Sequence, residues 1–143
     1  MFSLAELSDF EEIRQLTCDY ANAYDRGDAD GFAATFLPDG VSDSTSIGLN
    51  RVQGHNAIAD DIRHFRPQQE FVIHLATNQR VTVLDGDTAE GWCYFFAVGL
   101  VDGTRTLFAG RYDDQYERTP GGWKFKQRTL VRLLPSATGE LRI

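Results

Sequence analysis

Asp25 and His74 are the two residues whose types and settings best suit acid–base chemistry. Asp25 falls where a long amphipathic helix is expected to end, and a carboxylate is disfavoured there because the C-terminal end of a helix carries partial negative charge. His74 stands inside the apolar run from Phe71 to Ala76. If the carboxylate reaches the imidazole, it fixes the tautomer and stabilises the imidazolium, so that the pair acts as a general base. A solvated helix-end Asp25 and a hydrogen-bonded core His74 are the ordinary alternatives.

Arg128 and Arg132 lie on the last strand that the sequence predicts. Their even spacing puts both side chains on one face of that strand. Two guanidinium groups that face a pocket could hold an anionic or halogen-like leaving group, whereas a solvent-facing strand surface is the alternative for either residue. The nearby Asp113 and Asp114 are expected to be exposed strand charge.

The common motifs for phosphate, dinucleotide, zinc and acyl-transfer chemistry are missing from the sequence. The three histidines, His55, His64 and His74, do not have the spacing of a metal site, and no metal or cofactor is expected. Cys18 and Cys93 form no CxxC pair and are expected to be buried free thiols. Acid–base chemistry remains, because deprotonation beside an activating group needs only a base and an electrostatic partner.

The first half of the chain has the pattern of helices. Ser8 and Glu11 match a capping box, and the apolar stripe that follows predicts a helix over residues 9–26 that Gly27 ends. A short second helix is expected from Asp28 or Asp30, carrying Phe32 and Phe36 and ending before Pro38. Beyond it the sequence predicts a turn at 37–40, a weak strand and mobile loop over 41–51, and a third helix at 54–65.

The second half has the alternation of strands, predicted at 74–84, 88–101, 104–118 and 123–134 with short turns between them. Helices followed by a strand meander indicate a single α+β domain, residues 1–143, with the helices packed on one face of a curved sheet. The last ten residues lack periodicity and are expected to be a tail or an edge segment.

Composition narrows the possible partners. The chain has 143 residues, 42% of them apolar with ten Phe, so one domain can bury a core. Its formal net charge of −7 disfavours nucleic acid, because phosphate binding needs a basic surface. Neither a signal peptide nor an apolar run of about 20 residues is evident, so a cytoplasmic protein without a membrane partner is expected.

Several short segments, spread over nearly the whole chain, have a familiar order and spacing: Ile13–Leu16, Tyr24–Asp28, Gly54–Ile58, His74–Asn78, Gly110–Arg118 and Gly122–Phe125. Together they resemble the SnoaL-like branch of the NTF2-like superfamily, which has the ketosteroid-isomerase-like cone fold. The resemblance implies a cone-shaped barrel built from a curved antiparallel or mixed sheet. Within the superfamily the chain looks most similar to the group of hexachlorocyclohexane dehydrochlorinase, scytalone dehydratase and bile-acid 7α-dehydratase.

The resemblance also implies roles for individual residues. Asp25 and His74 fall on the positions of the catalytic dyad of this lyase group, and the segment His74–Asn78 looks like a dehydrochlorinase motif. Arg128 matches an active-site arginine of the dehydrochlorinase. Tyr20 matches the catalytic tyrosine of the bile-acid dehydratase, where the dehydrochlorinase has a lysine.

Two further residues match positions near the pocket of these enzymes. Tyr24 stands where scytalone dehydratase has a pocket tyrosine, and Arg132 matches an arginine close to the pocket of the bile-acid dehydratase. The second catalytic histidine of scytalone dehydratase has no counterpart in this sequence.

A cofactor-independent lyase of the dehydratase or dehydrohalogenase type is therefore expected. Its substrate would be a small, hydrophobic and cyclic molecule, held in a pocket whose aromatic lining includes Phe32, Phe36, Trp92 and Phe96. An isomerase or cyclase with the same dyad and a non-catalytic binding module are the alternatives. The resemblance implies a homo-oligomer, with a trimer favoured over a dimer because the lyases it resembles are trimers.

Overall fold

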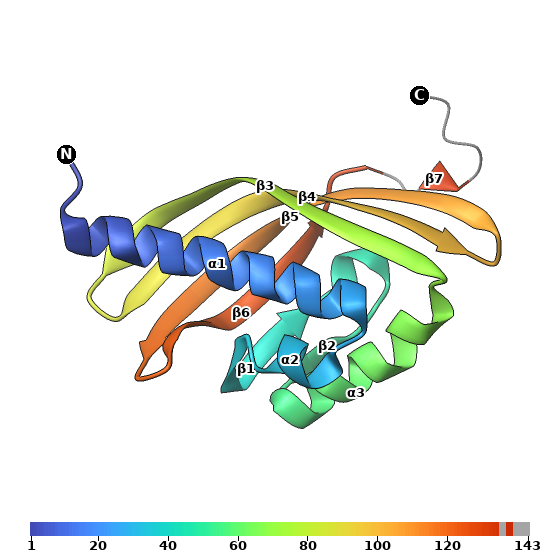
Figure 1. Ribbon diagram of the computed structural model, residues 1–143, viewed down its shortest axis with the longest axis horizontal. Coiled ribbons are helices and arrows are strands. Elements are labelled where there is room, and N and C mark those ends of the chain that lie inside the picture. The colour runs from blue at the N-terminus through green and yellow to red at the C-terminus, as the bar shows by residue number, and fades with distance from the viewer. Residues whose placement is uncertain (135–136, 139–143) are drawn as a thin grey trace.

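The computed structural model describes residues 1–134 and 137–138 (Figure 1). The helices are α1 (Leu4–Arg26), α2 (Ala29–Ala33) and α3 (His55–Phe65), with 3-10 turns η1 (Thr45–Ile47) and η2 (Arg66–Gln68). The strands are β1 (Phe36–Asp43), β2 (Arg51–Gln53), β3 (Phe71–Asp85), β4 (Thr88–Val101), β5 (Thr104–Thr119), β6 (Gly122–Arg132) and β7 (Ala137–Thr138).

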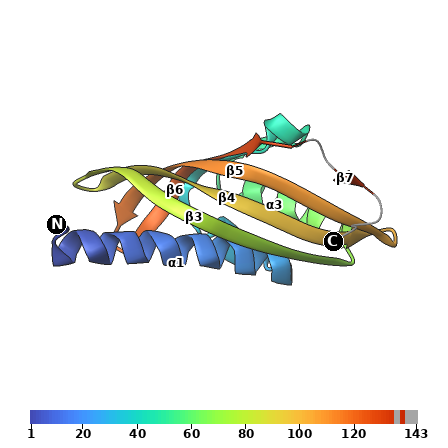
Figure 2. The ribbon, with the colours of Figure 1, turned by 90° about the horizontal axis from the view of Figure 1, so that it is seen from above.

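The strands form one mixed sheet in the order β2-β1-β6-β5-β4-β3, and β7 pairs with β5. All neighbours are antiparallel except β1 and β6, which run parallel. Figure 2 shows α1 along one face of the curved sheet, whereas the opposite face of β3, β4 and β5 carries no helix of the described residues. The predicted α+β class, with N-terminal helices on a curved mixed sheet, is confirmed, and the sheet is not closed into a complete barrel.

Helix α1 begins earlier than the sequence analysis predicted. The Ser3 hydroxyl accepts the backbone N–H of Glu6, and the Glu6 carboxylate accepts the backbone N–H of Ser3, which makes a complete capping box. The prediction of a cap at Ser8 is therefore wrong, because Ser8 lies inside a helix that has already started. The predicted end is confirmed: Gly27 follows the helix with a φ of 73°, a left-handed conformation that glycine adopts without strain.

The segment after α2 differs most from the prediction. Helix α2 ends at Ala33, and Phe36 already belongs to β1. The pairing of β1 with β6 shifts register between Phe36 and Val41, and this irregular stretch contains Pro38, which has no N–H to give to a ladder. The expected turn at 37–40 is thus a bulged strand. The expected loop at 41–51 contains the end of β1, the turn η1 and the start of β2.

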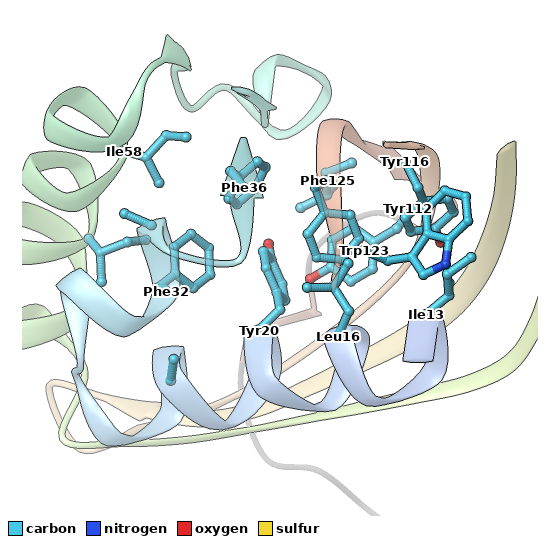
Figure 3. Packing of buried hydrophobic residues seen from close by; sticks show 14 of the residues in the cluster. Ile13, Leu16, Tyr20, Phe32, Phe36, Ile58, Tyr112, Tyr116, Trp123 and Phe125 are labelled. Carbon is cyan, nitrogen blue, oxygen red and sulfur yellow. The ribbon is translucent and has the colours of Figure 1, made fainter. Parts of the chain in front are cut away.

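The core lies between the inner face of the sheet and the helices. Figure 3 shows Tyr20 rising from α1 between Phe32 and Phe125. The buried core includes Ile13, Leu16, Tyr20, Phe32, Phe36, Ile58, Phe95, Tyr112, Tyr116, Trp123 and Phe125. Cys93 is buried as predicted, whereas Cys18 is only partly buried. Among the described residues, no helix is both long and apolar enough to cross a membrane.

Candidate active site

Asp25 and His74 meet where the last turn of α1 crosses β3. The Asp25 Oδ1 lies 2.7 Å from Nδ1 of the His74 ring, and its Oδ2 accepts the His74 backbone N–H at 3.0 Å. That amide is available to a helix because β3 is the edge strand of the sheet, with a partner on one side only. The two side chains are 18% and 13% exposed. A carboxylate held by both bonds places the ring proton on Nδ1 and leaves Nε2 as the basic nitrogen.

Two aromatic rings fix the orientation of the imidazole. Tyr24 packs edge-on against the His74 ring with centroids 4.9 Å apart, and the Phe95 ring stacks at 6.4 Å. The Tyr24 hydroxyl donates to Oε1 of Gln69 at 3.0 Å. Burial raises the pKa of Tyr24 to about 12, so this phenol stays protonated at neutral pH.

Arg66 binds the end of α1 that carries Asp25. Its Nη2 donates to the Asp25 carbonyl at 2.8 Å, its Nε to the Tyr24 carbonyl at 3.1 Å, and its Nη1 to the Gln69 carbonyl at 2.7 Å. The guanidinium therefore satisfies C-terminal carbonyls of the helix and places positive charge at the negative end of the helix dipole. Sequence reasoning missed this residue, because an arginine before a proline in an acidic chain gives no signal of such a contact.

A cavity of 320 Å³ opens beside His74. Its wall is mainly apolar and includes Phe32, Ile62, Val72, Phe95, Phe108 and Leu130. The wall also contains the hydroxyl-bearing residues Tyr20, Tyr24, Tyr112, Ser42, Ser44 and Thr106. A largely apolar cavity of this size with a few polar groups is suited to a small organic molecule. The segment 41–51, predicted as a weak strand and mobile loop, contributes Ser42, Ser44, Ile47 and Leu49 to this wall.

The predicted pocket residues divide into two groups. Tyr20, Tyr24 and Phe32 line the cavity with His74. Phe36 does not: it is 1% exposed and packs in the core behind Phe32, with ring centroids 5.9 Å apart.

Trp92 and Phe96 correct the prediction more clearly, since neither belongs to the cavity. Side chains alternate along β4, so the inward neighbours of Cys93 are Phe95 and Ala97, and Phe96 points to the other face, where it is 42% exposed. Trp92 lies on that outer face too and lines a separate hollow between α1 and β3. Phe95 takes the place in the pocket that the sequence analysis gave to Phe96.

The two arginines of β6 also differ from the expectation. Arg132 is at the exposed end of the strand, away from the cavity wall, and its backbone N–H donates to the Ser46 hydroxyl at 3.2 Å. Arg128 is 1% exposed and makes a two-pronged ion pair with Asp114, with both N–O distances 2.8 Å. Burial disfavours the guanidinium charge, but the Asp114 carboxylate raises the Arg128 pKa well above its usual range.

The expectation that Asp114 is exposed strand charge is wrong, because Asp114 is only 3% exposed. It lies between Tyr112 and Tyr116 on the inner face of β5, and this spacing of two residues was the signal that could have placed it. The Tyr116 hydroxyl donates to Oδ2 of Asp114 at 2.8 Å. Arg128 therefore lies behind the cavity wall rather than in it.

The groups that line the cavity, an imidazole backed by a carboxylate and several phenols, are suited to proton transfer. Within residues 1–134 and 137–138, no three His, Cys, Asp or Glu side chains are grouped so that they could hold a metal ion.

This chain is similar to a known domain family and to several known proteins. The SnoaL-like domain family matches residues 5–129. An uncharacterised protein of Mycobacterium tuberculosis is 36% identical over 139 residues, covering 92% of this chain and 90% of that protein. The gamma-hexachlorocyclohexane dehydrochlorinase of Sphingobium indicum is 28% identical over 131 residues, covering 90% of this chain and 83% of that enzyme.

A solved structure from Novosphingobium aromaticivorans, provisionally named an aromatic ring hydroxylase, is 32% identical with a TM-score of 0.88. The match covers 92% of this chain and 94% of that one. Because the family match and these relatives extend over most of the chain, it belongs to the SnoaL-like domain family of the NTF2-like superfamily.

Proposed function

We propose that this protein is a cofactor-independent lyase that removes a proton from a carbon atom of a small hydrophobic, cyclic molecule and expels water or another small leaving group. The observation that carries the proposal is the pair of hydrogen bonds that the Asp25 carboxylate accepts from His74 beside a largely apolar cavity. The similarity to a dehydrochlorinase over 90% of the chain supports a lyase-type activity.

In this mechanism His74 is the general base. Its Nε2 takes the proton from carbon, the C–H electrons form the new double bond, and the Asp25 carboxylate stabilises the imidazolium that results. Tyr20 donates its hydroxyl proton toward the leaving group. Burial raises the pKa of Tyr20, which keeps the phenol protonated before reaction. Tyr24 and Phe32 hold the apolar body of the substrate.

The test is a screen of cyclic β-hydroxy and β-chloro ketones, in which the conjugated product is followed by ultraviolet absorbance. Asp25→Asn and His74→Ala are expected to lower the rate by about 10²–10⁴-fold, the range of general-base catalysis, without unfolding the chain. His64→Ala is the matched control, because His64 is exposed and outside the cavity wall. Equal rates for all three variants and the parent would contradict the proposal.

Product analysis separates elimination from the two other outcomes that this cavity supports. Release of water or chloride identifies a lyase, whereas an isomerase or cyclase returns a product of the same composition as the substrate. If the protein is a non-catalytic binding module, the parent and the His74→Ala variant would bind the same compounds, and neither would convert them to product.

A further inference from the structure

Tyr112 is a cavity residue to which the mechanism above gives no task. It projects from β5 and is 3% exposed, and together with Tyr20 it forms part of the same cavity wall. The two rings meet edge to face with centroids 5.6 Å apart. The Tyr112 ring also stacks at 4.2 Å on Phe95, which in turn stacks on His74. A continuous row of rings therefore connects the base to the pair of phenols.

Arg128 lies against both phenols. Its Cζ is 4.4 Å from the centroid of the Tyr20 ring and 4.1 Å from that of Tyr112. The carboxylate of Asp114 occupies the Nε and Nη2 edge of the guanidinium. The third nitrogen, Nη1, is buried and has no hydrogen-bond partner among the residues that the structure describes. The cation therefore keeps one donor for negative charge that develops beside it.

The hydroxyl groups of the other phenols near the site already have hydrogen-bond partners. The Tyr24 hydroxyl donates to Gln69, and the Tyr116 hydroxyl donates to Asp114. Tyr20 and Tyr112 are the pair that shares a buried cation and a cavity wall.

We propose that Tyr112 is a positioning residue that acts through Tyr20, and that Arg128 serves this pair rather than the substrate. This inference rests on the proposed lyase function. When Tyr20 gives its proton to a leaving hydroxyl group, the C–O bond breaks and water departs. The Tyr112 hydroxyl and the Arg128 cation then stabilise the Tyr20 phenolate. His74 holds the proton taken from carbon, and its transfer back to Tyr20 restores both residues.

The influences of burial and of neighbouring groups on the pKa values of the two phenols support this division of roles. Burial raises the pKa of each phenol, while the Arg128 charge lowers both. The neighbouring Tyr112 side chain lowers the pKa of Tyr20, whereas Tyr20 raises the pKa of Tyr112. These directions agree with the geometry, in which Tyr112 touches the proposed proton donor Tyr20 edge to face and both rings lie against the Arg128 cation.

The experiment compares two leaving groups on one ring. Elimination from 3-hydroxycyclohexanone and from 3-chlorocyclohexanone gives the same enone, but only hydroxide needs a proton as it leaves. Tyr112→Phe, which removes one oxygen and keeps the ring, is expected to lower kcat for the hydroxy ketone by about 10- to 100-fold, the usual effect of losing a hydrogen bond to a charged group. For the chloro ketone a change below about threefold is expected, because chloride leaves as an anion.

Tyr94→Phe is the matched control, since Tyr94 is 36% exposed and is not part of the cavity wall. Loss of kcat for both ketones, or for neither, in Tyr112→Phe would overturn the assignment of Tyr112. Two other results would instead count against the lyase function. One is a parent chain that acts on neither ketone, and the other is a His74→Ala variant that acts on both ketones as fast as the parent does. The role of Tyr112 and the proposed function can therefore fail separately.

Discussion

At the scale of single residues, the buried ion pair between Arg128 and Asp114 combines a structural role with a position next to the candidate site. Their side chains are 1% and 0% exposed, so each charge depends on the other for compensation. Three aromatic rings surround the guanidinium within 4.4 Å of Cζ, those of Tyr20, Tyr112 and Phe125. Removing the cation would leave the Asp114 carboxylate with the Tyr116 hydroxyl but without a compensating charge in this aromatic environment.

Arg128→Met is therefore expected to lower the free energy of unfolding by about 3–5 kcal/mol, the cost of leaving one partner of a buried pair uncompensated. The measurement is urea unfolding followed by tryptophan fluorescence. Arg63→Met supplies the comparison, because Arg63 is 51% exposed in its pairs with Asp30 and Asp60 and is expected to lose less than about 1 kcal/mol. Similar losses in the two variants would contradict the structural role of Arg128.

The same scale shows what the sequence could and could not predict about the site. Asp25 and His74 were singled out by a helix end and an apolar strand, but only family resemblance predicted that they meet, because local patterns carry no information on distant pairing. The prediction that Phe96 rather than Phe95 lines the pocket was wrong for a simpler reason. Both faces of β4 are apolar there, so no alternation of polarity marks which face is buried.

At the scale of elements, α1 is fixed to the sheet at both ends. Asp25 binds His74 near its C-terminus, and Asp9 binds two strands near its N-terminus. The Asp9 carboxylate accepts the Arg118 guanidinium at 2.7 Å and the Trp123 indole N–H at 3.0 Å. The hydrogen bond from Arg118, helped by that from Trp123, lowers the pKa of Asp9.

A lowered carboxylate pKa means that Asp9 contributes stability above the usual carboxyl pKa of 3.8, which is lost as the pH falls through its lower value in the folded state. Asp9→Asn is expected to lower the free energy of unfolding by about 1–3 kcal/mol at pH 7. The difference from the parent should shrink below pH 3.8. Thermal unfolding over a pH series measures this, with Asp19→Asn on the exposed side of α1 as the control. A difference independent of pH would contradict the argument.

Element boundaries were predicted best where the chain has strong turn signals. The bounds of β4 agree with the expected 88–101, because Gly86 and Gly103 adopt positive φ values on either side of it. The segment from Phe36 to Gln53 was predicted poorly because its strands are short and its pairing with β6 is non-local, so the local sequence did not determine its structure.

At the scale of the whole molecule, the sheet has a second face that no helix within residues 1–134 and 137–138 covers. Phe71, Ile73 and Leu75 of β3 and Tyr94 and Phe96 of β4 are each between 36% and 52% exposed. They are neighbours across the two strands: Leu75 pairs with Phe96, for example. An apolar surface of this extent is typical of a contact with another protein.

A second copy of this chain is the expected partner for this face. The Arg111–Asp113 ion pair on the adjoining strand β5 gives the border of the patch both signs of charge, which suits contact with an identical surface. Light scattering should report a homo-oligomer, and Leu75→Glu with Phe96→Glu should yield a monomer whose circular dichroism is unchanged. Val83→Glu, at an exposed site farther along β3, should leave the oligomer intact. A monomeric parent chain would contradict the prediction.

The parallel pairing of β1 with β6 also has a consequence for the order in which the protein assembles. Strands β3 to β6 follow one another through tight turns, so they can form as local hairpins. The Ser46 hydroxyl, by contrast, donates to the Leu130 carbonyl, 84 residues away in the chain. During synthesis the segment that supplies Ser42, Ser44 and Ile47 therefore cannot make its contacts with β6 until that strand has left the ribosome. The cavity is among the last features to form, and a chain shortened before β6 would have a hairpin sheet without a binding site.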